Sequence, residues 1–408
     1  MRIGINGRFL VAKRTGVQRA AYNLVRTLFE VDRSNEYILF TGRSQLENPE
    51  WDYPNVTIVP SFIKEGENFR NHLWEQFELP RLAKKYKVDI LHSPANMAPL
   101  IYKRASIVHI HDLCFVVNPQ WYSYLFHRVY NFIIPRLARK STVVVTNSNN
   151  SRNDLLQFCD VDSEKVRLIY WAVDDTFHIV PKSSSLDKIK EGDYILYVGS
   201  LEPRKNISSL IKAYETLRLR NPDIKTKLVL IGGESPLFAD AQLKIKSYKN
   251  DIIFKGFVPD DMLRAYYRKA KVVAYPSLYE GFGLPPLEAM ASGSPVVTSN
   301  TSSLPEVVGD AALLVSPYDI DQIAATLARV IRSPQLQENL RQLGQEQVRK
   351  FNWYRVARNI LGVYYEVYSG LTGKDSESHL SLDTWKDLVI KEKQFLEQSR
   401  LNRLRVQL

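Results

Sequence analysis

The sequence has little cysteine and no long hydrophobic run. Its 408 residues contain two cysteines, Cys114 and Cys159, and no Cys-x-x-Cys pair, which excludes a disulfide framework and a cysteine-based zinc site. No apolar run approaches the roughly 20 residues that a membrane-spanning helix needs. The opening stretch is charged again at Lys13, so no signal peptide is expected. We therefore expect a cytoplasmic protein.

Acidic residues are outnumbered by basic ones. The formal net charge is +11, which attracts polyanions or an anionic membrane surface. The aromatic and basic alternation of a single-strand nucleic-acid platform is missing, so no nucleic-acid partner is expected. Several basic stretches are amphipathic. The alternative to a protein that is free in the cytoplasm is therefore one in peripheral contact with the inner face of the membrane.

Strand and helix patterns alternate in two successive series. The first contains "RIGING", "EYILFTG", "VTIVP", "VDILHSP", "ASIVHIHDL" and "TVVVTNS"; the second contains "YILYVGS", "KLVLIGG", "DIIFKGFV", "KVVAYPS", "SPVVTSN" and "AALLVSP". Alternation of this kind is typical of an α/β protein with parallel, doubly wound sheets and helices on both faces. The chain is long enough for two such domains, and we expect two Rossmann-like domains facing across a cleft.

The predicted domain boundaries follow changes in composition. An N-terminal Rossmann-like domain is expected over residues 1–178, and a C-terminal one over 188–350, joined by a Ser- and Lys-rich linker. Residues 351–372 are predicted to form a helix that crosses back to the N-terminal domain. Residues 373–408 form a charged, helical extension, which either packs on the protein itself or serves a partner or a membrane.

The stretch "YEGFGLPPLEAMASG" places Glu280 eight residues ahead of Glu288. The preceding "KVVAYPS" is typical of a buried strand, so Glu280 is predicted in the loop that leaves it. Pro is favoured at the start of a helix and Gly after its end. We therefore expect a helix from about Pro286 to Gly293, with Glu288 in its first turn.

A helix N-terminus after a glycine-rich turn suits an anion, because free N–H groups and the helix dipole attract it. A diphosphate is predicted to rest over Gly281, Phe282, Gly283 and Leu284. Carboxylates repel phosphate and suit neutral hydroxyls. In a nucleotide sugar, one acid would bind the ribose and the other the transferred sugar.

The stretch "YVGSLEPRKN" places Gly199 and Ser200 at the end of a strand, and Arg204 and Lys205 just before a helix. Two cations at such a strand exit can neutralise a diphosphate. The alternative is a pair of solvated surface charges.

Small residues also follow the next strands of the second domain. In "KGFVP", Gly256 and Phe257 leave room for a base or ribose to press against the backbone.

In the first domain, "IVHIHDL" ends a strand with His111 and Asp112. Ligands of open α/β sheets bind beyond the carboxyl ends of the strands, so both residues are predicted in the site. The alternative for His111 is a hydrogen-bonded core histidine.

The opening "GINGRF" does not complete a dinucleotide fingerprint, because no third glycine follows Gly4 and Gly7 before Gly16. Gly16 opens a helix after "KRT" and either faces the diphosphate through its N–H or is an ordinary helix-start glycine. No Asp-x-Asp pair follows a strand, so no metal and no other cofactor is expected.

Together these motifs resemble family four of the retaining, metal-independent, GT-B-fold glycosyltransferases, the glycosyl transferases group 1. The resemblance covers most of residues 1–370 and rests on "HDL", "VGSLEPRKN", "GF" and the two glutamates of "YEGFGLPPLEAMASGSPVV". The loop "RTGVQ" lacks the two adjacent glycines of many members but is similar to a single-glycine form found among mannosyltransferase-like members.

The resemblance implies roles for the motif residues of the second domain. Arg204 and Lys205 would bind the donor diphosphate, Glu288 the ribose, and Glu280 the hydroxyls of the transferred sugar.

In the first domain, the resemblance implies that His111 contacts the sugar near its reacting carbon and that Gly16 contacts the phosphate. The implied reaction moves a hexose, mannose by preference, from GDP-mannose or a UDP-hexose to a hydroxyl of a glycan or lipid-linked glycan, with retention of configuration, in polysaccharide biosynthesis. The alternatives are a nucleotide-sugar epimerase or hydrolase of the same fold, and a non-catalytic sugar-nucleotide-binding assembly protein.

Overall fold

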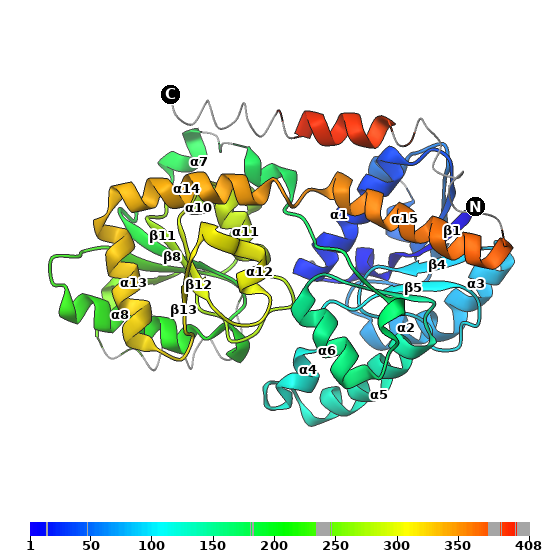
Figure 1. Cartoon of the computed structure of the whole chain (residues 1–408), viewed down its shortest axis with the longest axis horizontal. Coiled ribbons are helices and arrows are strands. Elements are labelled where there is room, and N and C mark those ends of the chain that lie inside the picture. Colours follow the sequence, from blue (N-terminus) through cyan, green and yellow to red (C-terminus); the bar gives the residue numbers. More distant parts are fainter. Residues whose placement is uncertain are drawn as a thin grey trace. The chain divides into compact units, whose positions relative to one another are not determined.

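The computed structural model of the chain divides into two compact units (Figure 1). One comprises Met1–Ala172 and Asn352–Leu396, and the other is built on Val173–Phe351. The residues that the structure describes are 1–13, 15–46, 48–179, 181, 183–233, 245, 247–373, 384, 386–395 and 397.

The first unit is a parallel sheet of seven strands in the order β3-β2-β1-β4-β5-β6-β7. Its strands are β1 (Arg2–Asn6), β2 (Glu36–Gly42), β3 (Val56–Ser61), β4 (Ile90–Ser93), β5 (Ser106–His109), β6 (Val143–Thr146) and β7 (Val166–Leu168). Its helices are α1 (Gly16–Val31), α2 (Asn68–Leu73), α3 (Leu79–Lys85), α4 (Cys114–Val117), α5 (Tyr124–Lys140), α6 (Asn149–Cys159) and α15 (Trp353–Thr372), and a π-helical turn, Trp74–Glu78, joins α2 to α3.

The second unit is a parallel sheet of six strands in the order β10-β9-β8-β11-β12-β13. Its strands are β8 (Tyr194–Val198), β9 (Lys227–Ile231), β10 (Ile252–Phe254), β11 (Val272–Tyr275), β12 (Val296–Ser299) and β13 (Leu313–Val315). Its helices are α7 (Ser183–Asp187), α8 (Ile207–Arg220), α10 (Asp260–Lys269), α11 (Leu284–Ala291), α12 (Leu304–Val308), α13 (Ile320–Arg332) and α14 (Pro334–Val348).

Both sheets are covered by helices on both faces, as expected for parallel sheets (Figure 1). The central strands are apolar and buried along their whole length; Ile3 and Ile5 of β1, like Ile195 and Leu196 of β8, have no exposed surface. In the second unit, α8 and α13 pack against each other over the core cluster that includes Ile195. The predicted fold class is therefore confirmed.

The strand order positions a binding site in each unit. β1 lies between β2 and β4, and β8 lies between β9 and β11, so successive connections leave these central strands in opposite directions. Crevices form at the carboxyl ends of the strands where the order reverses in this way. The residues that follow β1 and β4, and those that follow β8 and β11, are therefore the first places to look for function.

Two local predictions are wrong. The helix expected from about Pro286 begins at Leu284, because Gly283, directly before it, adopts a non-helical conformation with φ +114. Glu288 therefore lies in the second turn of the helix rather than in the first. The expected linker contains helix α7, whose Ser185 is buried and bonds Asp261 of α10.

Part of the C-terminal extension can be described. Residues 386–395 are helical and contact the first unit, where Glu392 pairs with Arg355 and Arg358 of α15, and Lys391 bonds Glu30 of α1. Most of the remaining extension lies outside the described residues. No helix within the described ranges is long and apolar enough to cross a bilayer.

Candidate functional site

The second unit buries a cluster of charges at the carboxyl ends of β8 and β11. The Lys205 ammonium donates to Glu280 Oε1 at 2.6 Å and to the Tyr275 hydroxyl at 2.6 Å. Arg204 Nη1 donates to Glu280 Oε2 at 3.0 Å, and the Ser277 hydroxyl donates to Oε1 at 2.7 Å. Lys205 is 6% exposed and Glu280 5%, so this is not the solvated surface pair considered as the alternative.

Backbone geometry brings the two loops of this cluster together. Asn206 adopts a left-handed conformation with φ +60 at the start of α8. Its side chain does not cap the helix but donates to the carbonyls of Pro276 and Pro317 at 3.0 and 2.7 Å. The Leu278 N–H donates to the Arg204 carbonyl at 2.8 Å. The loop after β8 is therefore fixed to the loop after β11.

The cations keep the buried carboxylate ionised. Burial alone would raise the pKa of Glu280, but the Lys205 ammonium and the Arg204 guanidinium lower it to about 2. The pKa of Lys205 is lowered, because burial and the neighbouring Arg204 outweigh the attraction of Glu280. Arg204 also pairs with Glu202, whose side chain is 49% exposed, at 2.7 Å. Glu202 is the partner of Arg204 that an incoming anion would displace most easily.

Glycines follow the carboxyl ends of three neighbouring strands of the second sheet, β8, β9 and β10. Gly199, with φ +154, donates its N–H to the Ile231 carbonyl, and Gly232 donates to the Gly256 carbonyl at 3.0 Å. A Cβ at Gly232 would lie 1.9 Å from the Gly199 carbonyl oxygen, so no larger residue fits there. Of the predicted residues, Gly199 and Gly256 thus lie on either side of Gly232. Phe257, the residue after Gly256, is 78% exposed.

Two further predicted residues accept hydrogen bonds from tyrosines of the second unit. The carbonyl of Ser200 accepts a hydrogen bond from the Tyr197 hydroxyl at 2.9 Å. Glu288 accepts a hydrogen bond from the Tyr267 hydroxyl of α10 at 3.0 Å and is half-buried.

The turn into α11 is held by two serines. The Ser303 hydroxyl is within 2.9 Å of the Glu280 carbonyl and 2.8 Å of the Phe282 carbonyl, and the Glu280 N–H donates to the Ser302 hydroxyl at 3.0 Å. Gly281 and Phe282 are buried. Pro285 and Pro286 supply no N–H, so Gly283 and Leu284 provide the N–H groups where the helix begins.

His111 lies in the first unit and is nearly fully buried. Its Nε2 is 3.0 Å from the Pro94 carbonyl, which makes Nε2 the protonated nitrogen. Nδ1 is then an acceptor, and it has no hydrogen-bond partner in the described part of the chain. Burial lowers the pKa of His111 to about 3, so the ring is neutral and packs at 4.4 Å from Trp171.

The other two predicted residues of the first unit lie at the starts of helices. Asp112 Oδ1 accepts a hydrogen bond from the Cys114 N–H at 3.1 Å and so supports the start of α4. Gly16 is the first residue of α1 and is exposed. Their roles toward a ligand stay predictions.

A second charged cluster was missed from the sequence. It lies after β1 and β4, where Asn6 Nδ2 donates to Glu75 Oε1 at 2.7 Å and lies 3.3 Å from the Ser93 hydroxyl. Arg8 pairs with the same Oε1 at 3.2 Å. Glu75 is 1% exposed, and although burial raises its pKa, Arg8 and the hydrogen bonds of His72 and Asn6 lower it overall.

The signal for this cluster was present but faint. Glu75 is an acid between the aromatic residues of "LWEQF", and it lies in the π-helical turn Trp74–Glu78. π-Helical turns are frequent at functional sites. The strand exit "INGRF" lacks the third glycine of a dinucleotide fingerprint, and no other pattern there predicts a site for Asn6 and Arg8.

Metal-ligating side chains do not form a cluster in the described ranges. No group of three or more His, Cys, Asp or Glu residues there is arranged to hold a metal ion.

Comparison with known proteins matches both halves of the chain. The family model described as "Glycosyltransferase Family 4" matches residues 14–177, and the one described as "Glycosyl transferases group 1" matches residues 181–347.

Two curated relatives are mannosyltransferases of Escherichia coli. O-antigen chain mannosyltransferase B is 30% identical over 86% of this chain and 96% of its own length. Serotype-specific mannosyltransferase WbdA is 29% identical over 78% of this chain but only 38% of its own length.

Two solved structures share the fold over most of the chain. Sucrose-phosphate synthase of Thermosynechococcus elongatus superposes with a TM-score of 0.70 at 20% identity, covering 91% of this chain and 100% of that one. HepE of Anabaena in complex with UDP-glucose gives a TM-score of 0.67 at 19% identity, covering 90% and 100%. With two family models covering its two halves and a relative matched over nearly its whole length, the chain belongs to the family-four, group 1 glycosyltransferases and has their GT-B fold.

Proposed function

We propose that this glycosyltransferase transfers mannose from GDP-mannose to a hydroxyl of a glycan or lipid-linked glycan, with retention of configuration and without a metal ion. The observation that carries the donor assignment is the buried Arg204, Lys205 and Glu280 cluster at the carboxyl ends of β8 and β11. The two mannosyltransferase relatives support mannose, and the UDP-glucose complex of HepE supports a nucleotide-sugar donor. A UDP-hexose is the second candidate donor.

The cluster suits a leaving diphosphate. Negative charge develops on the diphosphate as the glycosidic bond breaks, and cations already in place stabilise it without reorganisation. Arg204 and Lys205 supply two positive charges, and the N–H groups of Gly283 and Leu284 at the start of α11 add donors. Because these groups provide the charge that Mg²⁺ provides elsewhere, the proposed reaction requires no divalent ion.

Glu280 then has two successive tasks. Without a donor, its carboxylate neutralises Lys205 and Arg204 inside the protein. When a diphosphate binds, Arg204 turns toward the phosphate oxygens and releases both Glu202 and Glu280 Oε2. That oxygen then accepts a hydrogen bond from a hydroxyl of the transferred sugar, while Lys205 stays on Oε1. Glu288 takes the ribose hydroxyls.

The first unit is proposed to bind the acceptor. The strand order of the first sheet reverses where the buried cluster of Glu75, Asn6 and Arg8 lies. This cluster offers a hydrogen-bond acceptor and hydrogen-bond donors, which suit the hydroxyls of a sugar. His111 remains the proposed contact near the reacting carbon, since its neutral ring offers Nδ1 as an acceptor. Retention follows if the acceptor oxygen attacks from the face that the diphosphate leaves and a phosphate oxygen takes its proton.

Helix α5 offers a surface for peripheral membrane contact. Tyr124, Leu125 and Phe132 are 76%, 72% and 54% exposed, and Arg136 lies 3.6 Å from the centre of the Phe132 ring. No Asp or Glu occurs between Asp112 and Asp154. Exposed aromatic and basic side chains without acids favour an anionic bilayer, where a lipid-linked acceptor would be found.

A transfer assay tests the proposal. The purified protein is incubated with GDP-mannose, UDP-glucose or UDP-galactose, with methyl α-mannoside as acceptor, in the presence of EDTA. We expect a disaccharide from GDP-mannose whose new anomeric centre keeps the donor configuration by NMR. Lys205→Met should abolish transfer, while Lys212→Met, which changes an exposed lysine of α8, should not.

Other outcomes separate the rival functions. Nucleotide release that does not depend on the acceptor indicates a hydrolase. Conversion of the donor to an epimeric nucleotide sugar indicates an epimerase, and nucleotide binding without turnover indicates an assembly protein. Transfer that EDTA abolishes and Mg²⁺ restores contradicts the metal-free mechanism.

A further inference from the structure

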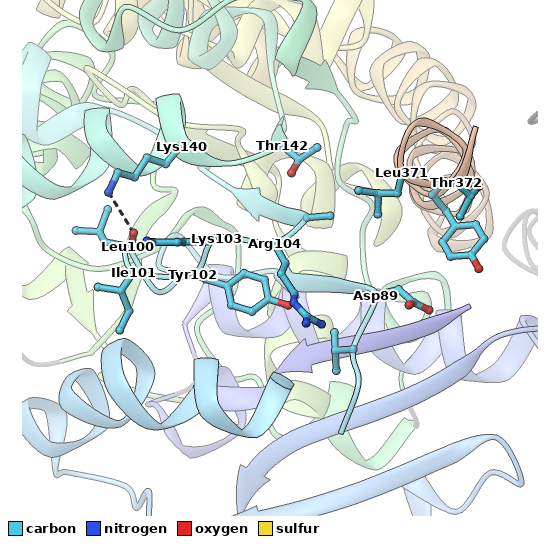
Figure 2. Close-up of a pocket in the computed structure, with 13 residues that line it drawn as sticks. Asp89, Leu100, Ile101, Tyr102, Lys103, Arg104, Lys140, Thr142, Leu371 and Thr372 are labelled. Carbon is cyan, nitrogen blue, oxygen red and sulfur yellow. Dashed lines mark hydrogen bonds between the residues drawn. The ribbon is translucent and has the colours of Figure 1, made fainter. Parts of the chain in front are cut away.

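The first unit contains a wide hollow of about 1040 Å³ at the opposite edge of its sheet from His111 (Figure 2). It lies at the amino ends of β4, β5 and β6, because Asp89, Ala105 and Thr142, which directly precede these strands, line it. The end of α15 contributes Leu371. None of the residues assigned to donor or acceptor binding lines this hollow.

Three cations line the hollow. They are Lys103, Arg104 and Lys140, and none of them forms an ion pair with a residue that the structure describes. The Lys140 ammonium donates to the Leu100 carbonyl at 3.4 Å. Like charges that line one hollow repel one another, so an anion bound between them would stabilise the hollow.

One carboxylate also lines the hollow. Asp89 Oδ2 accepts a hydrogen bond from the Arg2 N–H at 2.7 Å. Figure 2 shows Asp89 on the side of Leu371 and Thr372, Lys103 and Lys140 on the side of Leu100, and the Arg104 side chain between them. The two lysines, but not Arg104, therefore lie away from Asp89.

Tyr102 adds a hydrogen-bond donor without an acceptor. Its hydroxyl oxygen is buried and has no hydrogen-bond partner in the described part of the chain. Buried polar atoms are nearly always bonded, and an exception calls for a missing partner. Burial raises the pKa of Tyr102, Arg104 lowers it and Asp89 raises it, and the hydroxyl is therefore protonated at neutral pH.

The remaining lining is apolar. Leu100 and Ile101 lie on the side of Lys103 and Lys140, and Leu371 lies on the side of Asp89 (Figure 2); Ile101 and Leu371 are 52% and 56% exposed. Such side chains suit an apolar chain attached to the anion, since covering them removes apolar surface from water.

We propose that this hollow binds a phosphate monoester carried on an apolar chain. Lys103, Arg104 and Lys140 hold the phosphate, the Tyr102 hydroxyl donates to one of its oxygens, and the chain lies along Leu100 and Ile101. The phosphate could be a lipid headgroup or free phosphate, and the apolar border favours the lipid.

Calorimetric titration of the full chain tests the site with three probes: n-octyl phosphate, inorganic phosphate and the uncharged n-octyl glucoside, each below its micelle concentration. We expect n-octyl phosphate to bind most tightly. Lys103→Ala/Arg104→Ala should weaken it roughly 30-fold, and Tyr102→Phe about fivefold. Lys64→Ala, an exposed lysine of the same unit outside the lining, should change nothing.

The Tyr102→Phe variant separates binding from folding. It removes a buried hydroxyl that has no partner, so its melting temperature should stay level or rise while its affinity for n-octyl phosphate falls. Equal binding of inorganic phosphate and n-octyl phosphate would identify free phosphate as the source and remove the role of the apolar border. Equal binding of n-octyl glucoside, or unchanged affinity in the double alanine variant, would overturn the phosphate site.

Discussion

At the residue scale, the ion pairs of Glu280 link acid stability to the donor site. The pKa of Glu280 is lowered from 4.5 to about 2 in the folded protein. A lowered folded-state pKa stabilises the fold above the unfolded value, and this contribution is lost as the pH falls from about 4.5 towards 2. Because Glu280 is buried, the contribution is about 3 kcal/mol at neutral pH.

Glu280→Gln, which keeps the shape but removes the charge, should lower the free energy of unfolding of the second unit by about 3 kcal/mol at pH 7. Its deficit should shrink below pH 4.5 and vanish near pH 2, as measured by urea unfolding over this range. Glu338→Gln, which changes an exposed glutamate of α14 in the same unit, is the control. A constant deficit at all pH values would show that folding does not change the pKa of Glu280, and would contradict its stabilisation by the two cations.

A substitution of Glu75 should weaken binding of the acceptor substrate and leave binding of the donor nucleotide unchanged. Glu75→Gln keeps the hydrogen bond from Asn6 but removes the charge that Arg8 pairs with. We expect the KM for methyl α-mannoside to rise about tenfold or more, because hydrogen bonds to a charged acceptor contribute about 1.5–3 kcal/mol. The affinity for GDP should not change.

The measurement is steady-state kinetics with either substrate varied. A parallel loss of GDP affinity would show that Glu75 only supports the fold, and an unchanged acceptor KM would contradict the acceptor role.

The sequence predicted which residues of the second unit gather, because Arg204, Lys205 and Glu280 follow strands whose carboxyl ends share one edge of a parallel sheet. It could not predict that they pair with one another, since the Lys205–Glu280 contact joins residues 75 positions apart. Whether a carboxylate faces a ligand hydroxyl or a neighbouring ammonium depends on side-chain packing, which local patterns do not encode.

At the scale of secondary-structure elements, α11 depends on the backbone of Gly283. This residue has φ +114, and a Cβ would lie 2.8 Å from Leu304 Cδ2. Gly283→Ala should cost roughly 3 kcal/mol of stability, because it adds strain and overlap together. It should also weaken GDP binding, since the first N–H groups of α11 move.

Gly293→Ala is the matched control for Gly283→Ala. It also has a positive φ, +81, but its Cβ would first meet the flexible end of Arg268 at 3.2 Å. Thermal unfolding and GDP titration compare the two variants. Equal losses of GDP affinity in both would contradict a specific role for the N-terminus of α11.

Helix α5 should decide membrane attachment. Phe132→Ser should reduce binding to vesicles of phosphatidylglycerol and phosphatidylcholine about tenfold, because an inserted aromatic side chain contributes roughly 1.5–3 kcal/mol. Leu219→Ser, which removes a side chain that is 73% exposed in the second unit, is the control. Cosedimentation measures both, and equal binding by the two variants would rule out the α5 surface.

Element boundaries show where local patterns fail. Buried strands such as β11 were predicted well, because "KVVAYPS" is a short β-branched run. Helix α7 was missed, since five residues in a Ser-rich segment carry almost no helical period, and it is held by contacts of Ser185 with α10. Tertiary contacts, rather than propensity, form such a helix.

At the scale of the whole molecule, the two sheets bury separate cores. The cluster that includes Ile195 belongs to the second unit, while the clusters that include Val108 and Val11 belong to the first. The alternation of strands and helices predicted both units, because each βα repeat is local. The strand order could be anticipated only as a class, since it depends on which strands pair across the sheet.

Separate cores predict a separable response to the nucleotide. A ligand that binds the folded state stabilises it by about 2.7 kcal/mol at 100 times its Kd. Since Arg204, Lys205 and α11 all belong to the second unit, GDP should slow hydrogen exchange most in β8 and β11 and leave the core of β1, β4 and β5 nearly unchanged. GDP should raise the melting temperature more than UDP or ADP, and Lys205→Met should remove this rise. Protection by GDP that is strongest in β1 and β4 would place the nucleotide in the first unit and overturn the donor assignment.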